Sequence, residues 1–96
     1  MFIVSLTYTK PLNEVNEYVE AHIKYIKEHY DKGNFIASGR QVPSIGGVII
    51  SKLKSKVKLE EILKQDPFYI ANVANYEIME FISVITANGF DNLKDD

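Results

Sequence analysis

The chain contains no cysteine. This absence excludes disulfide bonds, thiolate nucleophiles, and zinc or iron–sulfur centres with cysteine ligands. Any chemistry that the protein performs must therefore use oxygen and nitrogen groups. Nothing else in the sequence indicates a metal or an organic cofactor, so we expect neither.

Long apolar runs and clusters of basic residues are also absent. No apolar run approaches the ~20 residues that span a bilayer, and residues 1–8 lack the positive flank and the length of a secretory signal. The formal net charge is −2 and the lysines are scattered, so the basic footprint of a nucleic-acid-binding surface is missing. We expect a cytoplasmic protein that binds neither membranes nor nucleic acid.

The length and the hydrophobic content predict one domain. A chain of 96 residues is too short for two ordinary domains, but 46% hydrophobic residues is enough for one packed core. We therefore expect a single domain over residues 1–96, in which residues 87–96 form a polar tail.

Hydrophobic periodicity predicts six regular elements. Residues 2–8 alternate as a strand, and helical spacing runs from Glu14 to a stop near Gly33, with Asn13 as the N-cap. Two strands over 34–39 and 46–51 form a hairpin, a short helix around Leu59–Leu63 ends before Asp66, and a last strand covers 76–86. The order βαββαβ predicts an α+β, ferredoxin-like fold with an antiparallel sheet and two helices on one face.

The first, third and fourth predicted strands carry apolar residues on both faces, although two helices can cover only one face of a sheet. Leaving large apolar side chains in water costs roughly 1.5–3 kcal/mol for each one. We therefore expect a homodimer that packs through its sheet faces. The alternative is that the terminal tail or the long hairpin covers the second face within one chain.

His22 is the first candidate for chemistry, because it lies on the apolar stripe of the first predicted helix. Burial disfavours a charged imidazole and can leave a neutral base, which general-base catalysis requires. The alternative is a core histidine that is bonded to a backbone carbonyl. His29 lies about 10 Å further along the helix, so the two histidines cannot share a metal ion, and we expect His29 to favour the helix dipole in the last turn.

Asp66, Arg40 and Ser38 are further candidates. Asp66 before Pro67 is a strong helix-start signal, and its carboxylate has enough lone pairs to cap a helix and also orient an imidazole. Arg40 is the only arginine, and its planar fork of donors suits an anionic ligand, although an ion pair with an acidic residue is the simpler interpretation. Ser38 lies beside it, outside any nucleophile-elbow motif.

Four local patterns occur in order: residues 21–26 (AHIKYI), 33–39 (GNFIASG), 42–49 (VPSIGGVI) and 66–68 (DPF). Together they resemble the YciI-like, or YCII-related, family over about residues 2–86. The resemblance implies a dimeric α/β-barrel assembly, His22 and Asp66 as a catalytic pair, and Ser38 and Arg40 as substrate-binding residues. Many members have proline where this chain has Arg40, so the substrate of a relative does not transfer.

The resemblance also implies a function. It points to a small cofactor-free enzyme of lyase, dehydrochlorinase or isomerase type that acts on a small cyclic or aromatic compound. The main alternative is a non-catalytic small-ligand-binding or interaction module. A cofactor-independent monooxygenase or muconolactone-isomerase-like enzyme is a third interpretation, which the Asp-Pro-Phe pattern disfavours.

Overall fold

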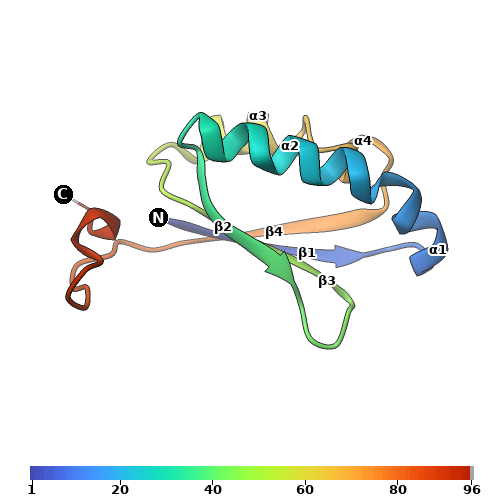
Figure 1. The fold of residues 1–96 in the computed structure, drawn as a ribbon. Helices are drawn as coiled ribbons and strands as arrows, with labels where there is room; N and C mark the ends of the chain where they lie inside the picture. The colour runs from blue at the N-terminus through green and yellow to red at the C-terminus, as the bar shows by residue number, and fades with distance from the viewer. Residues whose placement is uncertain (96) are drawn as a thin grey trace.

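The structure, a computed structural model, describes residues 1–95, and its four strands form one antiparallel sheet (Figure 1). The strands are β1 (Phe2–Tyr8), β2 (Phe35–Arg40), β3 (Gly46–Ser51) and β4 (Ala74–Glu80). Their order across the sheet is β2-β3-β1-β4, so β1 is central and pairs with both β3 and β4. The two edges of the sheet are β2 and β4.

Helices cover one face of this sheet (Figure 1). They are α1 (Leu12–Val15), the 3-10 turn η1 (Asn16–Tyr18), α2 (Val19–Asp31), α3 (Lys56–Leu63) and α4 (Pro67–Ile70), and a second 3-10 turn, η2 (Asp91–Leu93), follows near the C-terminus. The arrangement is an α+β fold consistent with the predicted ferredoxin-like class. Within residues 1–95, no helix is both long enough and apolar enough to cross a bilayer.

The core lies between the sheet and the helices. Phe2, Val4 and Leu6 point from β1 toward the helices and are at most 1% exposed. Leu59 and Phe68 pack against this row from α3 and α4. Because successive side chains of a strand point to opposite faces, the alternate residues of β1 line the face without helices.

The first predicted helix is interrupted, and its start was predicted wrongly. It begins at Leu12 rather than Glu14, and the side chain of Asn13 caps nothing. The carbonyl of Pro11, held at φ −57° and ψ 150°, instead accepts hydrogen bonds from the backbone N–H groups of Glu14 and Val15. At the other end, Gly33 has φ 75°, which confirms the predicted left-handed residue after the helix.

The last strand is shorter than predicted and ends at Glu80 instead of Thr86. Its partner β1 begins at Phe2, which pairs with Glu80, and Phe81 N–H makes one more bond to the Met1 carbonyl at 3.0 Å. Beyond that point, no strand of the described chain lies alongside to accept further backbone bonds. The alternating sequence continues, but the pairing partner does not.

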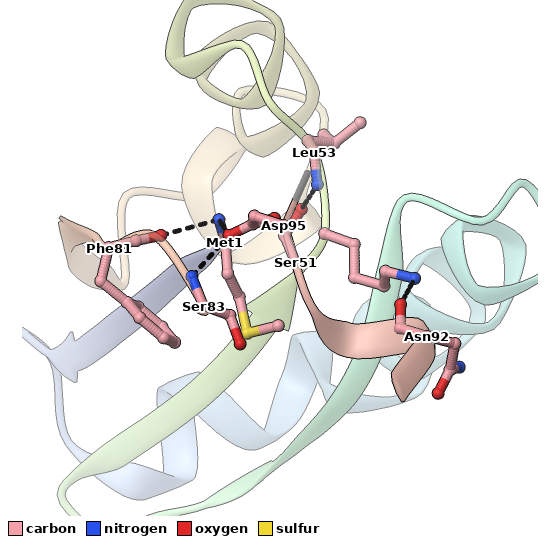
Figure 2. Close-up of polar contacts among 8 residues, drawn as sticks. Met1, Ser51, Leu53, Phe81, Ser83, Asn92 and Asp95 are labelled. Carbon is pink, nitrogen blue, oxygen red and sulfur yellow. Dashed lines mark hydrogen bonds and ion pairs between the residues drawn. The ribbon is translucent and has the colours of Figure 1, made fainter. Parts of the chain in front are cut away.

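The C-terminal tail is attached at the N-terminal end of β1 (Figures 1 and 2). The Met1 amino group donates to the Phe81 carbonyl at 2.9 Å and to Asp95 Oδ2 at 3.1 Å. Ser83 N–H donates to the same Asp95 oxygen at 2.8 Å, and this bond, followed by the bond from the terminal amino group, lowers the pKa of Asp95. The tail therefore lies beyond the end of the sheet rather than over its second face.

Candidate functional site

Asp66 is the fully buried residue around which the site is built. It is the N-cap of α4, with Pro67 in the first helical position, and its Oδ1 accepts a hydrogen bond from Phe68 N–H at 3.0 Å. The cap forms because an aspartate before proline leaves the helical backbone region and turns its carboxylate toward the free N–H groups. The predicted helix-start signal is confirmed.

His22 reaches this carboxylate from α2. Its Nδ1 lies 2.7 Å from Asp66 Oδ1, and the imidazole stacks on the Phe68 ring with centroids 4.0 Å apart and an interplanar angle of 6°. Because a carboxylate only accepts, the proton of a neutral imidazole lies on Nδ1, and Nε2 keeps its lone pair. The structure therefore brings His22 and Asp66 into direct contact.

The free nitrogen of His22 is accessible. Nε2 has no hydrogen-bond partner among residues 1–95. Every buried side-chain nitrogen or oxygen in this range has a partner, so Nε2 is not buried. The His22 side chain is 18% exposed and lines a cavity. A ligand in that cavity can therefore reach the lone pair on Nε2.

The cavity has a volume of about 570 Å³ and lies between α2 and strands β1, β2 and β3. Its walls are largely apolar, with Leu6 and Ile49 from the sheet and Val19 and Ile26 from the helix. Ser38 and Arg40 also line it, so three of the four predicted site residues share one cavity. Asp66, the fourth, lies behind His22 and is not part of the wall.

The charged residues of the cavity wall are all positive. Lys27 and Arg40 line it, and none of its lining residues is acidic. Within the described chain neither cation forms an ion pair, so the simpler interpretation of Arg40 is wrong. Tyr30 and Ser38 add a hydroxyl pair, with oxygens 2.6 Å apart. This arrangement favours a small anionic ligand.

Two tyrosines, the buried Tyr25 and the partly buried Tyr76, surround the carboxylate from other sides. Tyr76 O–H, from β4, donates to Asp66 Oδ2 at 2.7 Å, and Tyr25 O–H donates to the Ile62 carbonyl at 2.8 Å. Burial, followed by the charge of Asp66, raises the pKa of both tyrosines far above the usual range. Both hydroxyl groups therefore keep their protons, and can donate, at neutral pH.

Sequence reasoning did not identify Tyr76, Tyr30 or Lys27 as site residues. Tyr76 carried a usable signal: it lies on the helix-facing parity of the last strand, and a buried tyrosine hydroxyl needs a polar partner. Tyr30 also carried one, because it lies four residues after Ile26 and eight after His22, on the same stripe of α2. Lys27 carried none, because a lysine on a helix is ordinarily a surface residue.

His29 lies in the last turn of α2 as predicted, but the predicted charge at the helix terminus was wrong. It is only 3% exposed, packs against Tyr25 and Phe35, and accepts a hydrogen bond at Nδ1 from the Asn34 side chain at 3.0 Å. Burial is the main cause that lowers its pKa, so it is a neutral core histidine rather than a charge at the helix terminus. Among residues 1–95, no three histidine, aspartate or glutamate side chains are grouped as metal ligands.

These features define a class of protein: a small ferredoxin-like domain in which a histidine, bonded to a buried aspartate, lines a cavity whose charged residues are positive. The chain belongs to the YCII-related domain family, whose model matches residues 1–82. This confirms the family resemblance of the sequence.

Among solved structures, the chain is similar to a 5-chloro-2-hydroxyhydroquinone dehydrochlorinase from Burkholderia phenoliruptrix AC1100, determined in complex with 2,5-dihydroxybenzoquinone. The TM-score is 0.68 and the identity 16%, with 86% of this chain and 95% of the other chain covered. At this identity the likeness establishes the fold. No curated protein matches the sequence.

Proposed function

We propose that this protein is a small cofactor-free enzyme of lyase, dehydrochlorinase or isomerase type that moves a proton on a small cyclic or aromatic anion in the cytoplasm. One observation carries the proposal: the free Nε2 of His22 borders a cavity, while Nδ1 is bonded to the buried Asp66 at 2.7 Å. A base with one nitrogen fixed and the other open to a ligand is the arrangement that general-base catalysis uses.

Each site residue has a role in this proposal. Asp66 keeps His22 in the Nδ1–H tautomer and stabilises the imidazolium that forms when Nε2 accepts a proton. Arg40 and Ser38 hold the anionic group of the substrate. In an elimination, the substrate gives its proton to Nε2, the electron pair left behind forms the new double bond, and the leaving group departs with its own bonding pair. The step therefore needs no oxidant or reductant.

The solved relative supports the choice of substrate class. It is named for removing chloride from a hydroxylated ring compound, and it binds a dihydroxyquinone. The cavity of about 570 Å³ lies within the ordinary range for small-molecule sites, and its apolar walls suit the faces of a ring. Its two cations suit the acidic hydroxyl groups of such a ring.

The test compares the wild type with His22→Ala. Chloride release from 5-chloro-2-hydroxyhydroquinone is measured together with the binding of 2,5-dihydroxybenzoquinone, followed by amide NMR shifts. We expect His22→Ala to release chloride at least ~100-fold more slowly while it still binds the quinone, because the base is lost and the anion contacts remain. Lys24→Ala, on the exposed side of the same helix, is the control and retains wild-type activity.

Two outcomes would change the conclusion. Binding without turnover in the wild type, across chlorinated and unchlorinated hydroquinones, would favour the non-catalytic binding module. No binding and no turnover would contradict the proposed substrate class altogether.

We also infer that the domain, residues 1–96, assembles as a homodimer through its sheet faces. On the face without helices lie Ile3 from β1, Val48 and Ile50 from β3, and Met79 from β4, which is 63% exposed. The tail is attached elsewhere, and Val42 in the long hairpin is 91% exposed, so neither segment covers this face. A second copy is the occupant that the apolar face fits.

A further inference from the structure

The hydroxyl of Tyr76 contacts the oxygen of Asp66 that His22 does not use. Tyr76 O–H lies 2.7 Å from Oδ2, whereas His22 Nδ1 lies 2.7 Å from Oδ1. Phe68 N–H shares Oδ1 at 3.0 Å. The carboxylate is therefore held by three donors from three elements: α2, α4 and β4.

Tyr76 is part of this hydrogen-bond network without being part of the cavity. It does not line the cavity, and its ring packs edge-on against Tyr69 with centroids 5.5 Å apart. A change in its hydroxyl group can therefore reach a ligand only through Asp66 and His22.

We propose that Tyr76 is a positioning residue for His22: its hydroxyl fixes the rotation of the Asp66 carboxylate, and thereby the tautomer and the direction of the imidazole. This inference rests on the proposed function of His22. It adds a third member to the site and extends the site through the core to β4, on the far side of Asp66.

The physical reason is the rotational freedom of a carboxylate. The plane of an aspartate carboxylate turns over a broad range unless hydrogen bonds hold it. Without the Tyr76 hydroxyl, Oδ2 has no hydrogen-bond donor, and the carboxylate is held only through Oδ1. The carboxylate can then tilt, which lengthens the hydrogen bond between Oδ1 and His22 Nδ1. Because burial raises the pKa of Tyr76 above its usual range, its hydroxyl keeps its proton at neutral pH and can hold Oδ2.

Tyr76→Phe is the test, and Tyr25→Phe is a matched control. Both substitutions remove one hydroxyl group that donates one hydrogen bond, and both keep the aromatic ring. The partner of Tyr25 is the backbone carbonyl of Ile62, whereas the partner of Tyr76 is Asp66. The two variants therefore have similar structural consequences, and only one of them alters the carboxylate.

The first readout is the imidazole nitrogen spectrum of His22, which reports its tautomer and needs no substrate. We expect the Nδ1–H form to dominate in the wild type and in Tyr25→Phe, and an appreciable share of the Nε2–H form in Tyr76→Phe. The second readout is turnover: we expect kcat to fall about 10-fold in Tyr76→Phe with KM unchanged, because a misplaced base slows the chemical step and the cavity wall is intact.

The dependence on Asp66 is tested in the Asp66→Asn background. There, Tyr76→Phe should change neither the tautomer nor kcat further, because the tyrosine acts through the carboxylate. Wild-type nitrogen shifts and wild-type kcat in a folded Tyr76→Phe variant would overturn the proposal. If that variant does not fold, the wild-type Tyr76 hydroxyl proton decides: slow exchange with water supports the bond, and fast exchange overturns it.

The tautomer readout separates this inference from the proposed function. If the wild type is inactive but Tyr76→Phe still changes the His22 tautomer, the proposed enzymatic function is contradicted and the positioning role of Tyr76 is supported. If the wild type is active but Tyr76→Phe changes neither the His22 tautomer nor kcat, the proposed function is supported and the positioning role of Tyr76 is contradicted.

Discussion

Two histidines on one helix have different environments in this protein. His22 faces a cavity and a carboxylate, whereas His29 lies in the core among aromatic rings and Asn34. Their spacing placed both on one stripe, and only the packing of Phe35 and Phe68 distinguishes them. The sequence therefore predicted which side of the helix the histidines occupy, but not which one meets the cavity.

His29 predicts an acid-sensitive stability. Burial lowers its pKa below the ordinary value of 6.5, so below pH 6.5 the unfolded chain binds more protons than the folded one at this residue. Its contribution is fully present above pH 6.5 and is lost as the pH falls through the folded pKa. We expect urea unfolding to show a larger loss of stability between pH 7.5 and pH 5.5 in the wild type than in His29→Gln. Parallel pH profiles would contradict this account.

The elements show where alternation alone is insufficient. A strand is defined by its partner, and the alternation of residues 76–86 contains no information about where β1 begins. Likewise, the helical spacing after Pro11 predicts a helix but not the break at η1. The strands β1 and β3 and the stop at Gly33 could be predicted because each depends on its own residues.

The contact between β1 and β3 depends on Gly46. A Cβ atom at this position would lie 1.7 Å from the Leu6 carbonyl oxygen, which cannot move without separating the two strands. A glycine inside a strand often marks such a close approach of another backbone. We expect Gly46→Ala to lower the free energy of unfolding by about 2–3 kcal/mol in urea titrations.

Gly39→Ala is the control for that measurement. It is also in the hairpin, but a Cβ atom there would meet no heavy atom within 4 Å. We expect a change within about 0.5 kcal/mol. A loss at Gly46 no larger than the loss at Gly39 would mean that steric exclusion at Gly46 does not determine the β1–β3 distance.

At the scale of the molecule, the sheet has one covered face and one open face (Figure 1). The sequence predicted both, because β1 and β3 are apolar on both parities. Hydrophobic periodicity alone did not predict the cavity, whose walls come from segments as far apart in the chain as Leu6 and Phe68. The volume of a cavity between a helix and a sheet depends on the distance at which they pack. The hydrophobic periodicity of the sequence does not determine that distance.

The open face predicts the association state. We expect the wild type to sediment at twice the 11.0 kDa mass of the chain, and Met79→Lys to weaken the dimer at least ~10-fold, because a charge placed in an apolar interface loses its hydration. Val57→Lys is the matched control: Val57 is 67% exposed, close to the 63% of Met79, but it lies on α3 on the opposite side of the sheet. A monomeric wild type, or equal weakening by both variants, would leave the sheet face without a partner copy. The apolar residues of that face would then have to be explained by a different protein partner.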